Sequence, residues 1–203
     1  MFTENEISSL ALIPEIKEAT IRLKNEFIEK EAPFMEISEH DFLSLIFLTP
    51  SVGIALANDS VSLMEEMALN KKARKYSKGG YFMKQDPVVT AMGHLIKNYD
   101  EWADTFYAQI KLFVEILIDK DALKEKNKDD NTSNEQLCID VLQAPFFLIR
   151  VITSFLSNAE DEDLAAERKV LKVEYDRIVE ILEKIDLIDL PIVQNHIKRL
   201  IIK

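Results

Sequence analysis

The chain has 203 residues, a formal net charge of −11 at pH 7 and a single cysteine. The length fits one domain that can bury a sizeable core without disulfides or structural metals, and the acidic balance disfavours nucleic acid and anionic membranes as partners, because both are polyanions. One cysteine and an N-terminus without a basic leader are typical of a protein of the reducing cytosol, so we expect a cytoplasmic location.

Glycine is rare in this chain. Only four residues are glycine, whereas average usage is about 7%. Because glycine supplies positive φ angles and close backbone approach, few tight turns and few phosphate-binding loops are expected, and Walker A, Rossmann and GxSxG patterns are missing from the sequence. The composition therefore predicts an all-α fold, a single-domain helical bundle of six or seven helices over residues 1–203.

The first 50 residues predict three helices. Thr3 and Glu6 have the spacing of a capping box, and a second helix is expected from Pro14 to near Pro33. Its buried face has helical spacing and consists of Ile16, Thr20, Leu23 and Phe27. The short apolar run 42–48 is expected to be a third helix, which begins near Ser38 and stops at Pro50.

A fourth helix is predicted to end near Tyr76. Ser51 is expected to cap a short turn before it, and Asn58, Asp59 and Ser60 offer N-caps for the helix itself. Its inward residues are predicted to be Val61, Leu63, Met64 and Met67. The Gly79–Gly80 pair then breaks the chain.

The clearest amphipathic pattern follows Asp86 and Pro87, an N-cap and first-turn proline. The helix is expected to reach about Lys120, with steps of three or four residues along one face. That face consists of Val88, Met92, Leu95, Tyr99, Trp102, Phe106, Ile110, Phe113 and Leu117. If Tyr99 is buried, its hydroxyl requires a hydrogen-bond partner. Residues 119–135 are charged and rich in Asn and Asp, which predicts a mobile loop.

Residues 137–156 are apolar on nearly all sides, which is typical of the central helix of a bundle. Pro145 is expected to kink this segment or to mark the junction of two shorter helices. Asp140 and Arg150 argue against a membrane span. Cys138 is interpreted as a small core residue.

The C-terminal region predicts two further helices. The first is expected to begin at the acidic run 160–163, with an inner face of Leu164, Arg168, Leu171, Tyr175, Ile178, Leu182 and Ile185. The second begins at Pro191 and continues to about Ile201.

Asn58, Ser62 and Glu66 are spaced i, i+4, i+8, so one helix would place them on one face. This set resembles the Mg²⁺-binding asparagine-serine-glutamate motif of class I terpene synthases, which implies a Mg²⁺-dependent diphosphate-handling enzyme. That family also uses an aspartate-rich motif, and Asp100, Glu101 and Asp104 have its spacing, although they follow the first motif instead of preceding it. The preferred interpretation is an N-cap with a solvated helix face, and for the second set a solvated acidic face, so no metal, cofactor or catalytic residue is predicted.

Residues 71–78 reverse the acidic balance of the chain. They contain five cations and no acid, namely Lys71, Lys72, Arg74, Lys75 and Lys78. This segment is the candidate partner-binding patch, and the alternative is a helix C-terminus stabilised by its cations. Of the three histidines, His94 lies beside the apolar stripe and is interpreted as structural, and no pair has the spacing of a metal site.

The sequence therefore predicts a non-enzymatic interaction protein of the cytosol, an adaptor, regulator or immunity-type inhibitor whose acidic surface binds a basic partner. A second hypothesis is a helical protein that binds a hydrophobic small molecule, with its pocket lined by Phe106, Tyr107, Phe113, Phe146, Phe147 and Phe155. The Mg²⁺-dependent enzyme is the third. The identity of the partner and the oligomeric state stay open, including a homo-oligomer.

Overall fold

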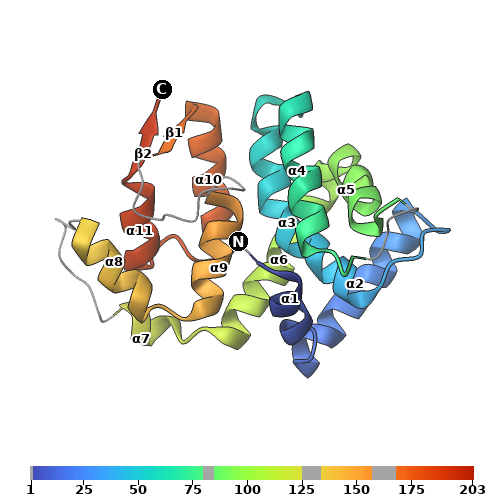
Figure 1. Cartoon of the computed structure of the whole chain (residues 1–203), viewed down its shortest axis with the longest axis horizontal. Coiled ribbons are helices and arrows are strands. Elements are labelled where there is room, and N and C mark those ends of the chain that lie inside the picture. The colour runs from blue at the N-terminus through green and yellow to red at the C-terminus, as the bar shows by residue number, and fades with distance from the viewer. Residues whose placement is uncertain (1, 80–84, 125–133, 157–167) are drawn as a thin grey trace.

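The computed structural model describes residues 2–79, 85–124, 134–156 and 168–203. It confirms the all-α fold, and the described residues contain more and shorter helices than the six or seven predicted (Figure 1). In chain order the elements are α1 (Glu4–Leu10), α2 (Pro14–Glu31), α3 (Glu39–Ala55), the 3-10 turn η1 (Leu56–Asn58), α4 (Leu63–Tyr76), α5 (Pro87–Lys97), α6 (Tyr99–Leu117), α7 (Lys120–Lys124), α8 (Asn134–Gln143), α9 (Phe146–Leu156), β1 (Arg168–Val170), α10 (Lys172–Lys184), α11 (Pro191–Ile197) and β2 (Leu200–Ile202).

The helices form two groups that α6 joins. Figure 1 shows α1 to α5 on one side and α8 to α11 on the other, with α6 passing from the first group to the second. Helix α3 lies at the centre and packs against α2, α4, α5, α6, α9 and α10. Every residue of α3 from His40 to Ala55 is buried. The predicted central segment 137–156 divides at Pro145 into α8 and α9; α9 packs on α3, and α3 is the more completely buried helix.

The predicted end of a helix at Pro50 is wrong, because Pro50 lies inside α3, and Ser51 is a buried residue of that helix and not the cap of a turn. An interior proline costs about 3 kcal/mol through its missing N–H and its clash with the preceding turn. Full burial of one Leu, Ile or Phe side chain contributes about 1.5–3 kcal/mol. Two apolar residues beyond Pro50, Val52 and Ile54, are buried against the neighbouring helices, so their burial offsets the cost of continuing the helix.

The long helix predicted over residues 87–120 divides at Asn98, which ends α5 and begins α6. The cause is a tertiary contact: the Glu31 carboxylate at the end of α2 accepts hydrogen bonds from the Asn98 side chain and from Trp102 Nε1, the latter at 2.7 Å. The predicted stripe survives the break, since its members from Val88 to Phe113 are buried.

Aromatic rings from the N-terminus, α2, α3 and α6 pack together in the core. Phe27 lies against Phe42 and edge-on to Trp102 and Phe106, with ring centroids 5.0–5.7 Å apart. Phe47 stacks on Phe2 at 4.5 Å. Such pairs contribute about 0.5–1.5 kcal/mol beyond the burial of their area.

The C-terminal region departs from the purely helical prediction. β1 and β2 pair in parallel, with Val170 opposite Ile202, and the Lys203 N–H donates to the Val170 carbonyl at 3.0 Å. Consequently α10 begins at Lys172 and α11 ends at Ile197. The predicted helix start at 160–163 and Leu164 lie outside the described residues, and Leu171 is a half-exposed N-cap and not part of the inner face.

Two further predictions concern flexibility and membranes. In the segment predicted as a mobile loop, 119–135, the described residues include α7 and the start of α8, while 125–133 lie outside the described residues. Among the described helices, residues 39–58 alone are long and apolar enough to cross a bilayer, and nearly all of them are buried inside the bundle, as in the core helix of a soluble protein.

Candidate functional site

Helix α4 has a well-formed N-terminal cap. Ser62 Oγ accepts from the Glu65 N–H at 3.3 Å, and the Glu65 carboxylate accepts from the Ser62 N–H at 2.7 Å, which completes a capping box. Acids occupy the first turn and Arg74 and Lys75 the last, as the helix macrodipole favours. The helix therefore forms a defined rod of 14 residues.

Polar side chains of α3 hold the other end of α4. The carbonyl of Tyr76 accepts from His40 Nε2 at 3.0 Å and lies 3.0 Å from Ser44 Oγ. The carboxylate of Asp41, which is fully buried, accepts from the Lys78 N–H at 2.9 Å. These contacts satisfy backbone groups that a helix end leaves without intrahelical partners, and they fix the orientation of α4 on the bundle.

The inner face of α4 consists of Leu69, Lys72, Ala73 and Tyr76. Lys72 is the unexpected member, because it is buried while the other cations of the 71–78 segment are exposed. Its ammonium group donates to the Ser154 carbonyl at 2.8 Å and to Ser51 Oγ at 3.1 Å. Ser154 lies in the last turn of α9, where a cation stabilises the terminal carbonyls.

Lys72 therefore has to be removed from the predicted partner-binding patch. The spacing i, i+3, i+4, i+7 of residues 69, 72, 73 and 76 places Lys72 on one helical face with Leu69, Ala73 and Tyr76, and the contacts of the fold make this face the buried one.

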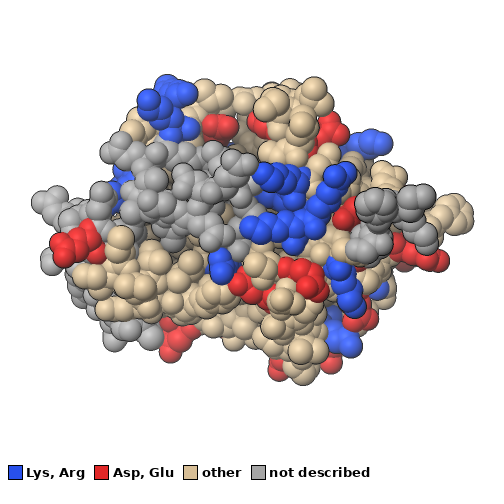
Figure 2. Space-filling view, viewed as in Figure 1, with Lys and Arg blue, Asp and Glu red and all other residues tan. Residues whose placement is uncertain are grey.

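The outer face of α4 corrects the prediction that its first apolar residues point inward. Leu63, Met64 and Met67 are 72%, 74% and 58% exposed. Further along the same face lie the exposed cations Lys71, Arg74 and Lys75, followed by Lys78 beyond the helix end. We call Leu63, Met64, Met67, Arg74, Lys75 and Lys78 the α4 surface, and Figure 2 shows basic side chains gathered over this helix.

The cations of the α4 surface differ from several other cations of the molecule in having no ion-pair partner among the described residues. Lys17, Lys30 and Lys184, for example, pair with carboxylates of neighbouring elements. For the side chains of Arg74, Lys75 and Lys78, no ion pair occurs with any other described residue. The α4 surface thus combines large apolar side chains with cations that have no carboxylate partner in the described part of the fold.

The geometry assumed for a metal site is wrong. Asn58 belongs to η1, Asp59 follows it in the left-handed conformation (φ 62°), and α4 begins only at Leu63. Asn58, Ser62 and Glu66 therefore do not share one helix, and all three are exposed. Among the described residues, no group of three or more His, Cys, Asp or Glu side chains is arranged to hold a metal ion.

The second acidic set, Asp100, Glu101 and Asp104, lies exposed on α6 as predicted for a solvated face. Two of its members make ion pairs with other helices: Glu101 with Lys30 and Asp104 with Lys184, at 3.7 and 2.7 Å. The hydrogen bond that the Lys184 ammonium group donates to the Asp104 carboxylate raises the pKa of Lys184. These carboxylates stabilise helix contacts at the surface.

Four of the six aromatic residues suggested as a ligand pocket pack into the core instead, namely Phe106, Tyr107, Phe113 and Phe147. Phe106, Tyr107 and Phe113 are fully buried, while Phe146 is exposed and Phe155 is not described in its side chain. The described residues do form an open depression of about 720 Å³, but it lies elsewhere, between α2, the 33–38 connection and the start of α5. Its lining mixes apolar residues such as Ile28 and Met35 with charged ones such as Lys24 and Glu29.

Tyr99 finds the partner that the sequence required. Its hydroxyl hydrogen-bonds to the hydroxyl of Tyr107, two turns along α6. Burial raises the pKa of Tyr99 and raises that of Tyr107 well above its usual value. Gly53 of α3 makes room for this pair, because a Cβ there would lie 2.2 Å from one hydroxyl and 2.5 Å from the other.

The interpretation of Cys138 as a core residue is wrong: it is exposed on α8, near the exposed Ile139 and Leu142. This helix lies at the edge of the molecule (Figure 1), so its apolar pattern does not correspond to full burial. His94 is partly buried in the last turn of α5, which is compatible with a structural role.

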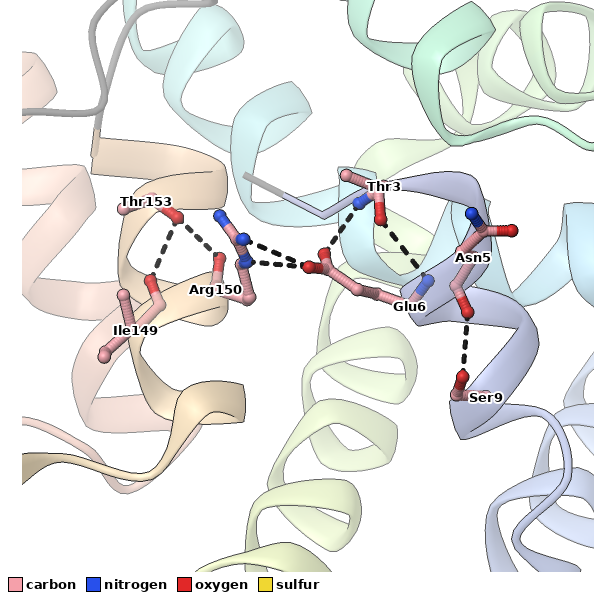
Figure 3. A network of polar contacts seen from close by, with 7 residues as sticks. All are labelled: Thr3, Asn5, Glu6, Ser9, Ile149, Arg150 and Thr153. Atoms are coloured by element: carbon pink, nitrogen blue, oxygen red, sulfur yellow. Dashed lines mark hydrogen bonds and ion pairs between the residues drawn. The ribbon is translucent and has the colours of Figure 1, made fainter.

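A contact that sequence reasoning did not find ties the N-terminus to α9. Figure 3 shows the Glu6 carboxylate between two helices: one oxygen accepts from the Thr3 N–H at 2.8 Å, and the other accepts from Arg150 Nε and Nη2, each at 3.1 Å. The Arg150 guanidinium also lies 4.5 Å from the centroid of the Phe146 ring. The Thr3–Glu6 capping box was readable in the sequence, whereas its partner 144 residues away was not.

Comparison with models of protein families, with curated proteins and with solved structures finds no match for this chain. Any functional assignment therefore depends on the surface and interior of this molecule alone.

Proposed function

We propose that this protein is a non-catalytic protein-interaction module of the cytosol, and that it docks its partner on the α4 surface. The observation that carries the proposal is the exposure of Leu63, Met64 and Met67 on a helix whose other face is anchored in the core. Burial of such a side chain stabilises a complex by about 1.5–3 kcal/mol. Three adjacent exposed apolar side chains can therefore contribute strongly to the free energy of binding a partner.

The position of the apolar residues beside cations favours a specific contact. Interfaces combine an apolar centre, enriched in Met and Arg, with a charged periphery that steers and orients the partner. The α4 surface has both parts on one rod, which the capping box and the α3 contacts hold in place. A pre-organised surface of this kind loses little entropy on binding.

The net charge of the chain favours a basic partner, whereas the α4 surface favours an acidic one. The range over which charges act in salt solution decides between the two. The net charge of −11 favours basic partners at long range. Charges more than about 8 Å from a contact are screened at physiological salt. The exposed cations Lys71, Arg74, Lys75 and Lys78 outnumber the two acids of α4, Glu65 and Glu66, so we keep an interaction protein and place its contact on a cationic surface.

A photo-crosslinking residue at position 67 tests the proposal in the cells that naturally produce the protein. We expect a discrete crosslinked adduct from position 67. The matched control is position 12, because Leu12 is equally apolar and 81% exposed but lies in the turn between α1 and α2. The same adducts from both positions, or none from position 67, would contradict docking on α4.

A further inference from the structure

The arrangement of the α4 surface also indicates what kind of protein segment it binds. We propose that its occupant is an acidic amphipathic helix that lies antiparallel to α4, with carboxylates in its first turn and apolar side chains two to three turns later. This inference rests on the proposed function, because it names the partner of the same surface.

The order of residues along α4 sets the order required in the partner. The apolar residues Leu63, Met64 and Met67 come first, and Arg74 and Lys75 follow Met67 by seven and eight residues. At 1.5 Å per residue this separation is about 11–12 Å, or two turns. A complementary helix needs apolar side chains and carboxylates at the same separation, since both kinds of contact must form together.

The sign of the charge follows from the cations. Arg74, Lys75 and Lys78 are exposed and make no ion pair with any residue of the described ranges. Buried Lys72, in contrast, has acceptors within the fold. A carboxylate placed over Arg74 forms a charge-assisted, bidentate contact, so an acidic segment is the complementary one.

Helix electrostatics determine the direction of the occupant. In an antiparallel pair, the first turn of the partner lies beside the last turn of α4, where Arg74 and Lys75 are located. Carboxylates are favoured in the first turn of a helix by its macrodipole. In an antiparallel partner, the carboxylates of the first turn thus interact favourably both with the N-terminal end of their own helix and with the cations of α4. A parallel partner would need its carboxylates in its last turn, where the helix macrodipole disfavours them.

The side chains of the apolar part suit a helical occupant. Leu63 and Met67 are spaced i, i+4 and form a ridge of the type that packs into the groove of another helix. Methionine adapts its shape to the partner surface, which is why it is common where helices dock.

The test is a fluorescence-anisotropy titration of the full chain with synthetic peptides of about 18 residues, long enough to cover α4 at 1.5 Å per residue. The first peptide carries four Glu in its first turn and Leu two and three turns later. A second peptide has the acids in its last turn, and a third has Lys in place of Glu. We expect binding of the first peptide and at least about tenfold weaker binding of the other two.

Variants of the chain connect the binding to the α4 surface. We expect Arg74→Glu with Lys75→Glu, and separately Met64→Gln with Met67→Gln, to weaken the first peptide by at least about tenfold. The charge-matched control is Lys97→Glu with Lys169→Glu, two lysines that are exposed on α5 and β1, and it should change binding by less than about twofold. Circular dichroism verifies that each variant is folded.

Other outcomes would overturn the inference. Equal binding of the first two peptides contradicts the antiparallel direction. If the chain binds vesicles of phosphatidylcholine and phosphatidylserine more strongly than it binds the first peptide, and the variant Arg74→Glu with Lys75→Glu loses this binding, the occupant is an anionic membrane. A concentration-dependent dimer in light scattering, lost in the same variant, identifies a second copy of the chain. If no peptide binds while crosslinking at position 67 still captures a partner, the partner class is wrong and the proposed function stands; if both fail, both are wrong.

Discussion

Helices α3 and α4 lie side by side, yet they place polar and apolar side chains in opposite ways. Helix α3 buries polar residues together with its apolar ones, including Asp41, Ser44 and Thr49. Helix α4 exposes Leu63 and Met67 and buries the charged Lys72. The position of a helix in the fold, surrounded or at the surface, determined burial more strongly than the hydrophobicity of each side chain.

The difference follows from hydrogen bonding. A helix enclosed on all sides must satisfy each of its polar groups inside the protein, and on α3 Ser44 and Thr49 donate to backbone carbonyls of their own helix. A surface helix needs only one anchored face, and for α4 that face includes Leu69, Ala73 and Tyr76. Apolar residues that fall on its other face stay in water unless a partner covers them.

The largest expected effect contrasts a buried ring of α3 with an exposed side chain of α4. Phe42→Ala should destabilise the protein by about 3–5 kcal/mol, because it leaves a cavity beside Phe27 and Phe106. Met67→Ala should change stability by less than about 0.5 kcal/mol. Urea denaturation followed by circular dichroism measures both, and similar losses for the two variants would contradict the exposure of Met67.

The second prediction compares two lysines of α4. Lys72→Met should cost about 1–3 kcal/mol, because it removes a charged donor from the Ser154 carbonyl and from Ser51. Lys75→Met, an equal change at an exposed position, should be neutral within about 0.5 kcal/mol. Thermal unfolding of the two variants in parallel tests this, and a neutral Lys72→Met would show that the buried contact contributes little.

The third prediction concerns the contact of α3 with α6. Gly53→Ala places a methyl group against the hydroxyls of Tyr99 and Tyr107, and such overpacking costs about 1–3 kcal/mol. Alanine gains about 1 kcal/mol over glycine in a helix, so a net loss of up to about 2 kcal/mol is expected.

A double-mutant cycle with Tyr99→Phe identifies the cause of that loss. Removal of the nearer hydroxyl should recover part of it, because Phe leaves space for the added methyl group. Additive effects of Gly53→Ala and Tyr99→Phe would mean that the steric contact is not responsible.

The effect that is smallest at neutral pH concerns Tyr76 on the inner face of α4, and it develops only above about pH 10. Burial raises the pKa of Tyr76 far above its usual value. The folded state therefore keeps the proton that the unfolded state loses near pH 10, so this contribution is complete below pH 10 and falls by about 1.4 kcal/mol for each pH unit above it. Tyr76→Phe should flatten the alkaline decline of stability measured by urea denaturation, and an unchanged slope would contradict the burial of the hydroxyl.

Much of the fold was predictable because helical periodicity is a local property. The stripe from Val88 to Phe113 was identified correctly along its length, and the capping residues Thr3, Ser38 and Asp86 mark helix starts in the structure. The rarity of glycine correctly indicated an all-α chain. Each of these signals depends on residues a few positions apart, which the chain order already places together.

The outer face of α4, which carries the proposed function, was not predictable in this way. Leu63, Met64 and Met67 form a periodic apolar set, and so do Leu69, Ala73 and Tyr76; only contacts with α3 decide which set is buried. The break at Asn98, the acceptors of Lys72 and the pairing of β1 with β2 likewise depend on residues 21 to 82 positions apart. Local chemistry thus fixed where helices form, whereas the competition among helices for the interior selected the face that remains available to a partner.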